Sequence, residues 1–146
     1  GRKYIGTGTK YYFEDIGIRN AVVDFRQIEF THIMENVVYN ELRKQGYTVD
    51  VGSVESFKRD ENGKLQRRNL EIDFVVNRHD ERLYIQSAYA LPDKEKVDQE
   101  QASLLNVNDG FRKLIIVGDR YHSGYNEEGI LMMSLSDFLL EKENKS

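Results

Sequence analysis

The sequence predicts an α/β domain in which helices flank a mixed β-sheet that contains an antiparallel meander. Phe30–Gln45 repeats apolar residues three and four positions apart, which is typical of an amphipathic helix. Three segments with strand-like alternation follow, joined by polar turns, and they indicate the meander. The continuous apolar run within Lys113–Val117 is typical of a strand that is buried on both faces. A length of 146 residues suits one domain with a real core.

Composition narrows the functional classes. Apolar residues make up 39% and charged residues 32%, which is typical of a folded, soluble chain. The net charge of −4 provides no general basic field, so any contact with nucleic acid requires a local patch. The absence of cysteine excludes disulfides, thiolate metal sites and cysteine nucleophiles. No apolar run has membrane-spanning length and no signal peptide is evident, so we expect a cytoplasmic protein without membrane contact.

The expected organisation is a linker or tag remnant at residues 1–9, a domain at residues 10–140 and a flexible tail at residues 141–146. The first residue is glycine rather than an initiator methionine, and the opening segment is rich in Gly, Thr and Lys. Gly6–Lys10 resembles a phosphate loop in composition alone, because it lacks the Walker spacing. A short helix is expected at Ile16–Val23.

The helix expected at Phe30–Gln45 carries two acids whose positions matter. Gly46 follows it as a C′ glycine, which ends the helix. At ~100° per residue, Glu35 falls at the edge of the apolar stripe. Glu41 falls inside the stripe, so it requires a partner such as Arg19 or Arg43.

The meander follows directly after this helix. Its strands are expected near Tyr47–Val51, Gln66–Asn77 and Leu83–Ala90. The turns between them are expected at Asp60–Gly63 and Arg78–Glu81, where turn-forming residues gather.

The C-terminal half is expected to complete the sheet and its cover. Asp93 is a suitable N-cap for a helix that ends near Asn106. The inner side of this helix is predicted to comprise Val97, Gln101, Leu104 and Leu105. The remaining elements are predicted to be a strand at Lys113–Val117, a loop at Tyr121–Glu128, a strand at Ile130–Met133 and a helix at Ser136–Leu140.

Strand alternation predicts which polar side chains meet. A hairpin centred between His79 and Asp80 places Asp73 directly opposite Gln86. Ala88 then belongs to the same patch, because it lies two residues beyond Gln86. Strict alternation also puts Asp73 on the face of Val75, and it puts Ile72 and Phe74 together on the other face.

These residue types in this pattern point to metal chemistry. An acid on a helix, an acid on one strand and a polar residue on the next is the layout of metal-dependent nucleases. Carboxylate and amide oxygens suit Mg²⁺ or Mn²⁺, so we expect Glu35, Asp73 and Gln86 to converge in one concave patch. The alternative is a structural partner for Asp73, such as a backbone amide or an arginine. The position where such an enzyme carries lysine is Ala88.

Several segments together resemble a large prokaryotic family. They are Lys10–Ala21, Met34–Leu42 with Gly46-Tyr47, Glu71–Val76 and Ile85–Tyr89. The family is the uncharacterised C-terminal domain of predicted P-loop ATPases of the AAA+ type, which is similar to PD-(D/E)XK, or restriction-endonuclease-like, nucleases. The resemblance extends from about Lys10 to Leu140.

The resemblance implies a restriction-endonuclease-like core and assigns a role to each site residue. Glu35 is the helix acid, Asp73 is the first strand acid and Gln86 stands at the second, so these three would hold Mg²⁺ or Mn²⁺. Ala88 departs from the family lysine, which Lys113 could replace only by reaching across from a neighbouring strand. The resemblance also implies upstream ATPase and winged-helix domains, with ATP bound there alone.

A basic cluster flanks the predicted Asn62-Gly63 turn. It comprises Lys58, Arg59, Lys64, Arg67 and Arg68. A solvated hairpin tip and a finger that contacts phosphates are both compatible with this pattern.

The leading functional prediction is therefore a degenerate nuclease-like module that serves an ATPase through nucleic-acid or protein contacts, without efficient catalysis of its own. One alternative is an active Mg²⁺- or Mn²⁺-dependent DNase that uses Glu35, Asp73 and Gln86. Another is a pure interaction or dimerisation domain, with a homo-oligomer as its product.

Overall fold

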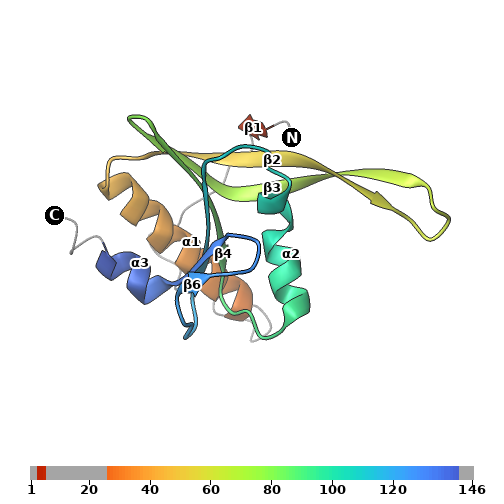
Figure 1. The fold of residues 1–146 in the computed structure, drawn as a ribbon. Coiled ribbons are helices and arrows are strands. Elements are labelled where there is room, and N and C mark those ends of the chain that lie inside the picture. Colours follow the sequence, from red (N-terminus) through yellow and green to blue (C-terminus); the bar gives the residue numbers. More distant parts are fainter. Residues whose placement is uncertain (1–2, 6–25, 142–146) are drawn as a thin grey trace.

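A computed structural model describes residues 3–5 and 26–141 of the chain, and a seven-stranded sheet organises them (Figure 1). The strands are β1 (Lys3–Ile5), β2 (Thr48–Arg59), β3 (Leu65–Arg78), β4 (Glu81–Ala88), β5 (Arg112–Val117), β6 (Gly124–Tyr125) and β7 (Leu131–Ser134). The helices are α1 (Arg26–Lys44), α2 (Lys94–Leu105) and α3 (Leu135–Glu141). The helix expected at Ile16–Val23 lies outside the described residues.

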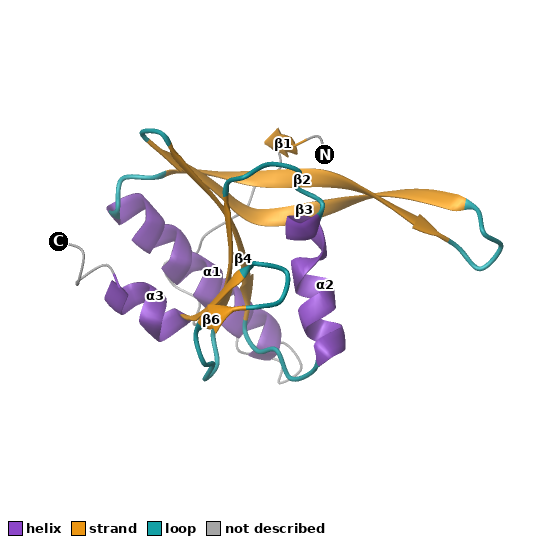
Figure 2. Cartoon of the chain, viewed as in Figure 1, coloured by secondary structure: helices purple, strands orange, loops and turns teal. Residues whose placement is uncertain are grey.

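The sheet is mixed, as predicted, with strand order β1-β2-β3-β4-β5-β7-β6. Strands β1 to β4 pair antiparallel, which confirms the meander, whereas β4, β5 and β7 are parallel neighbours. β6 closes the far edge by pairing antiparallel with β7. Helices α1 and α3 cover one face of the sheet and α2 covers the other (Figure 2).

Each face of the sheet has its own core. The α1 core is formed mainly by Met34, Val38, Leu42, Tyr47, Phe74, Val76, Ile85, Leu114, Ile116, Met133 and Phe138. The α2 core is formed by Val54, Ile72, Val75, Tyr84, Leu104, Val107, Ile115, Val117, Ile130 and Met132. The two cores use alternate residues of β5, whose continuous apolar run is therefore buried on both sides, as predicted.

Helix α1 matches the predicted helix and begins four residues earlier. Gly46 follows it with φ +90° and donates its N–H to the carbonyl of Arg43. This left-handed C′ position is the reason for a glycine there. The partly buried Glu41 accepts a hydrogen bond from Gln45 Nε2 at 3.2 Å, so one of its partners lies four residues further along the chain. Arg19 lies outside the described residues.

A β-bulge interrupts the pairing of β2 with β3 and corrects one prediction. Asp50 pairs with Val75, but Gly52 pairs with Ile72, so β3 contains one extra residue in this interval. An extra residue reverses the alternation beyond it. Ile72 consequently packs with Val75 in the α2 core, while Phe74 packs in the α1 core, and the predicted sharing of a face by Ile72 and Phe74 is wrong.

The bulge also explains why position 52 is glycine. A Cβ on Gly52 would lie 2.5 Å from Cγ2 of Val75 and 3.2 Å from Cβ of Ile72. Both neighbours face the same core because of the extra residue in β3. Gly52 therefore supplies the space that this irregular pairing requires.

Strands β2 and β3 are longer than predicted, and their distal parts project beyond the helices as a two-stranded ribbon (Figure 1). We call residues 55–69 the β-arm. Asp60 organises its turn, because its Oδ1 accepts the backbone N–H groups of Asn62 and Lys64, both at 2.9 Å. Gly63 completes the turn at φ +77°, so the predicted Asp60–Gly63 turn is confirmed.

The remaining elements follow the predictions with three differences. Asp93 caps α2 by accepting the Lys96 N–H at 2.8 Å, as expected, but Leu105 is 47% exposed and does not belong to the inner side. β6 lies within the predicted loop Tyr121–Glu128. β1 lies within residues 1–9, which we expected to be a linker, and pairs with β2. No helix among the described residues is long and apolar enough to cross a membrane.

Candidate functional site

The predicted register between β3 and β4 is confirmed, and it places Asp73 and Gln86 at the point where the backbone ladder stops. The ladder runs from Arg78↔Glu81 to Phe74↔Ile85, so the next pair would be Asp73 opposite Gln86. At this pair, side chains supply hydrogen bonds between the strands. The Asp73 carboxylate Oδ2 accepts the backbone N–H of Ser87 at 2.9 Å and the Ser87 hydroxyl at 3.3 Å.

Gln86 bridges three elements through its amide. Its Oε1 accepts the backbone N–H of Asp73 at 2.7 Å, and its Nε2 donates to the carbonyl of Glu100 on α2 at 3.4 Å. The side chain is buried, with 7% of its surface exposed. Gln86 thereby accepts the Asp73 N–H beside the bulge and ties the sheet to α2.

The Asp73 carboxylate and the Gln86 amide are directed toward different faces of the sheet. Asp73 meets the hydroxyl of Ser87, which alternates with the α1-core residue Ile85. Gln86 alternates with the α2-core residue Tyr84 and contacts α2. The alternation that put Asp73 and Gln86 on one face is therefore interrupted by the bulge, where Asp73 stands.

The position of the missing lysine is filled by a packed side chain. Ala88 is 3% exposed, so no cation occupies this point. Lys113 does not replace it, because its ammonium turns back and donates to the carbonyls of Asp109 and Phe111 at 3.1 and 3.2 Å. Asp109 in turn accepts the hydroxyl of Tyr84 at 2.6 Å, which holds this corner together on the α2 side.

Glu35 lies at the middle of α1, half-buried, on the helix that covers the face toward which Asp73 turns. The structure thus places Glu35 and Asp73 on one side of the sheet and directs Gln86 to the other. Among residues 26–141, no three His, Asp or Glu side chains form a group that could hold a metal ion. Because Gln86 is directed to the other face of the sheet from Asp73, the three side chains expected to bind Mg²⁺ or Mn²⁺ do not form one site.

Sequence reasoning missed two participants in this corner, Ser87 and the carbonyl of Glu100. The signal for Ser87 was present, since a hydroxyl beside Gln86 in an otherwise apolar strand needs a hydrogen-bond partner. The carbonyl of Glu100 had no signal, because which helical turn packs over a strand depends on tertiary structure.

The β-arm carries four of the five predicted cations on its two faces and the fifth, Lys64, in its turn. Pairing of Phe57 with Arg67 and of Arg59 with Leu65 puts these four side chains on one face. The neighbouring pairs, Ser56 with Arg68 and Lys58 with Gln66, define the opposite face. Both faces of the ribbon are therefore basic.

Two of these cations are engaged within the arm. Arg67 forms an ion pair with Glu55 at 2.6 Å, and Arg59 donates to the Gly63 carbonyl at 2.8 Å. Within the described part of the chain, Lys58, Lys64 and Arg68 form no ion pair with any side chain. The arm also exposes Phe57 by 57% and Leu65 by 53%, which the sequence analysis missed. Their signal was strand alternation, which sets both side chains on one face of the ribbon.

The chain is similar to one part of a longer protein. It is 31% identical over 141 residues to a protein of Haemophilus influenzae whose name is "Uncharacterized protein", and the match covers 97% of this chain. The same match covers 31% of that relative, so the chain spans about a third of its length. No family model matches the sequence.

Proposed function

We propose that this chain is a nuclease-like module that has lost catalysis and that contacts nucleic acid through the β-arm. The observation that carries the proposal is the basic ribbon itself, which projects beyond the helices (Figure 2). Three of its cations, Lys58, Lys64 and Arg68, form no ion pair with a side chain of the described residues. In this proposal, the core descends from a restriction-endonuclease-like protein but no longer has its activity.

The electrostatics of the arm support a phosphate-contacting role. Residues 55–69 contain five cations and three carboxylates, whereas the whole chain has a net charge of −4. The arm therefore has a net positive charge on a molecule that is acidic as a whole. Cations that neutralise backbone phosphates release condensed counterions, which is the main source of nonspecific affinity for nucleic acid.

The shape of the arm supports the same role. The major groove of B-DNA admits a two-stranded β-ribbon. Because cations occupy both faces of the arm, a ribbon lying in the groove presents positive charge to the phosphates of both strands. The exposed Phe57 and Leu65 lie on one face and provide an apolar surface for base edges or sugars.

The core supports the loss of catalysis. The side chains at the second acid and lysine positions, Gln86 and Ala88, are both buried, and Gln86 is used to hold strands and helix together. Loss of a general base typically costs ~10²–10⁴-fold in rate. Water activation by a lysine at position 88 is absent by composition, and Lys113 is engaged elsewhere.

The proposal also concerns the polypeptide to which this module belongs. We infer that the module works as the C-terminal part of a cytoplasmic AAA+-type ATPase, with ATPase and winged-helix domains in the same polypeptide. The extra length of the Haemophilus influenzae relative is compatible with such domains. In that setting the β-arm would hold nucleic acid while the ATPase acts on it.

Fluorescence anisotropy with a labelled DNA duplex tests the binding proposal. Reversing Lys64, Arg67 and Arg68 to glutamate should abolish most binding at low salt. It should also flatten the plot of log affinity against log salt by about 0.9 for each phosphate that the arm no longer neutralises. The matched control reverses Arg43, Lys94 and Arg120, three exposed cations outside the arm, which changes the net charge by the same amount.

The control variant should bind as the unmodified chain does, apart from a small general loss. Equal weakening by both variants would show that net charge alone governs binding and would overturn the role of the arm. Absence of binding by the unmodified chain at low salt would favour the interaction or dimerisation domain instead, which analytical ultracentrifugation would then examine.

Plasmid cleavage tests the loss of catalysis. We expect no cutting with Mg²⁺ or Mn²⁺ near neutral pH. Cleavage that disappears in Asp73→Ala but persists in Asp93→Ala would establish the active DNase instead. Asp93 suits the control because its side chain only caps α2.

A further inference from the structure

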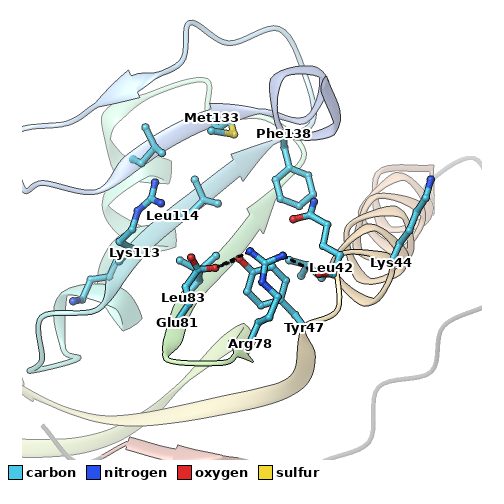
Figure 3. A pocket seen from close by; sticks show the side chains of 13 residues that line it. Leu42, Lys44, Tyr47, Arg78, Glu81, Leu83, Lys113, Leu114, Met133 and Phe138 are labelled. Carbon is cyan, nitrogen blue, oxygen red and sulfur yellow. Dashed lines mark hydrogen bonds and ion pairs between the residues drawn. The ribbon is translucent and has the colours of Figure 1, made fainter. Parts of the chain in front are cut away.

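We propose that a pocket at the opposite end of β4 from Gln86 binds a small carboxylate with an apolar body. The pocket lies on the α1 side of the sheet, between the C-terminal end of α1 and helix α3, and has a volume of about 410 Å³ (Figure 3). Small-molecule sites typically measure ≈300–1,000 Å³. The proposal is independent of the nuclease-like corner and of the β-arm.

The floor of the pocket is apolar and preformed. It consists of Leu42, Leu83, Leu114, Leu131, Met133 and Phe138. Four of the six belong to the buried α1 core, so the main chain beneath the floor is held by the sheet. In Figure 3 the Phe138 ring, Met133 and Leu114 close the side of the pocket away from Tyr47 and Arg78. An apolar body of a ligand would displace water from this surface.

The rim is strongly cationic. Lys44, Arg78, Arg112 and Lys113 line the pocket together with a single carboxylate, Glu81. This concentration stands out in a chain whose net charge is −4. A site with an apolar floor and an excess of positive charge at its edge matches a ligand that is anionic at one end and apolar along its body.

Some rim groups are already engaged and shape the site. Arg78 donates to the Gln45 carbonyl at 2.8 Å, lies 3.4 Å from Glu81 and stacks 4.3 Å above the Tyr47 ring. The Tyr47 hydroxyl donates to Glu81. Figure 3 shows these three side chains grouped at one wall. They form a fixed polar wall rather than a free anion receptor.

One further cation is available to a ligand. Arg112 lines the pocket, is exposed and forms no ion pair with any residue in the described part of the chain. Its planar guanidinium can donate two parallel hydrogen bonds to a carboxylate. Lys44 is also exposed, but in Figure 3 its side chain is directed away from Leu114 and Met133. The geometry thus assigns carboxylate recognition to Arg112.

Isothermal titration of the chain with hexanoate, octanoate and decanoate tests the site. Affinity should rise about fourfold for each methylene that the floor buries. Octanol and octylammonium should bind at least tenfold more weakly than octanoate, because each lacks the carboxylate. The natural ligand could be a free fatty carboxylate or the C-terminus of a peptide, and N-acetyl-leucine represents the peptide. If octanoate binds more tightly than N-acetyl-leucine for each apolar carbon, the ligand is a fatty carboxylate.

Variants and spectroscopy locate the binding. Arg112→Gln should weaken octanoate binding tenfold or more, since a hydrogen bond to a charged group is removed. Arg120→Gln, an exposed arginine outside the pocket, should leave it unchanged. In spectra of methyl-labelled methionine, octanoate should shift Met133 in the floor but not Met132, which packs in the α2 core.

Four experimental outcomes would overturn the proposal. They are no response to octanoate at millimolar concentration, equal binding of octanol, equal weakening by both arginine variants, or a Met132 shift as large as that of Met133. Circular dichroism of Arg112→Gln confirms folding, and because Met133 reports on the unmodified chain, the test does not depend on that variant.

Discussion

Strands β2 and β3 contain two regions whose polar side chains have different roles, the bulge and the β-arm. At the bulge, the polar groups of Asp73 and of its neighbours across the ladder are turned inward and satisfied by other parts of the fold. On the β-arm, most polar side chains of residues 55–69 are turned outward, and three of its five cations, Lys58, Lys64 and Arg68, form no ion pair with a described residue. The comparison separates side chains that hold the protein together from side chains that are available to a partner.

The difference has a physical basis in the helices. Near Asp73 the strands are covered on one face by α1 and on the other by α2, so an unpaired polar group there carries a desolvation cost. The arm has no helical cover, and its backbone groups are paired within the ribbon. The buried polar groups must therefore satisfy one another, whereas the charges of the arm can remain in contact with solvent or a partner.

The largest expected effect is on the bulge, through Gly52→Ala. The added Cβ would lie 2.5 Å from Cγ2 of Val75 and 3.2 Å from Cβ of Ile72, so either the Val75 side chain or one of the strands must shift. Overpacking of this kind costs about 1–3 kcal/mol of the free energy of unfolding, and we expect the upper end because both neighbours are fully buried. Urea denaturation measures the change. Gly124→Ala is the control, because a Cβ there meets nothing within 4 Å.

A normal stability for Gly52→Ala would mean that β2 and β3 can pair without the bulge. Asp73 and Gln86 could then share one face, as strict alternation predicts, and the inward role assigned to this corner would lose its support.

The second effect concerns Gln86→Leu. This change keeps the approximate size of the side chain but removes the acceptor of the Asp73 N–H and the donor to the Glu100 carbonyl. Unsatisfied buried groups cost ~1–3 kcal/mol, so we expect a loss of about 2 kcal/mol in urea denaturation without any added metal. Gln99→Leu, on the exposed side of α2, should change stability by less than ~0.5 kcal/mol.

The two substitutions at glutamine distinguish a structural residue from a metal ligand. A residue kept for metal binding would leave the metal-free protein equally stable when replaced by leucine. Equal stability of the Gln86 and Gln99 variants would therefore return Gln86 to the candidate ligand set.

The contrast also explains how far the sequence could predict this molecule. Periodicity identified α1, the meander and the buried strand β5, because these depend on local alternation and on turn residues such as Gly46 and Gly63. The turn at His79 and Asp80 sufficed to predict the register of Asp73 against Gln86. Local pattern failed where one extra residue in β3 reversed the faces, because a bulge depends on how two strands pair.

The site was harder to predict than the fold for a related reason. Residue types suggested ligands at Asp73 and Gln86, but the hydrogen bonds that engage them come from Ser87 and from α2, far along the chain. The five cations of the β-arm were predicted from the sequence alone. Their separation into two faces required the register of the ribbon.

A third effect, which is confined to alkaline pH, extends the comparison to another inward-facing polar group. Burial, followed by the hydrogen bond to Glu81 and its negative charge, raises the pKa of Tyr47 from 10.0 to about 12. The unfolded chain releases this proton near pH 10 while the folded chain holds it to about pH 12. The stability contributed by this group is thus complete below pH 10 and is lost as the pH rises to 12.

Denaturation curves of the unmodified chain and Tyr47→Phe should therefore converge between pH 10 and pH 12. Tyr125→Phe, at a tyrosine that is 69% exposed, is the control and should follow the unmodified chain throughout. A difference between the unmodified chain and Tyr47→Phe that stays constant from pH 9 to pH 12 would contradict the raised pKa.

The smallest effect is expected on the arm, and it is the one that completes the comparison. Arg67→Ala removes the ion pair between Arg67 and Glu55, whose side chains are 63% and 35% exposed, respectively. Exposed pairs contribute ~0–1 kcal/mol because solvent screens them and because ordering two long side chains costs entropy. Lys58→Ala and Arg68→Ala remove no ion pair of the described residues and should change the free energy of unfolding by less than ~0.5 kcal/mol. If any of these arm variants costs as much as Gln86→Leu in the same urea assay, the arm is part of the structural framework. Its cations could then no longer be assigned to a partner.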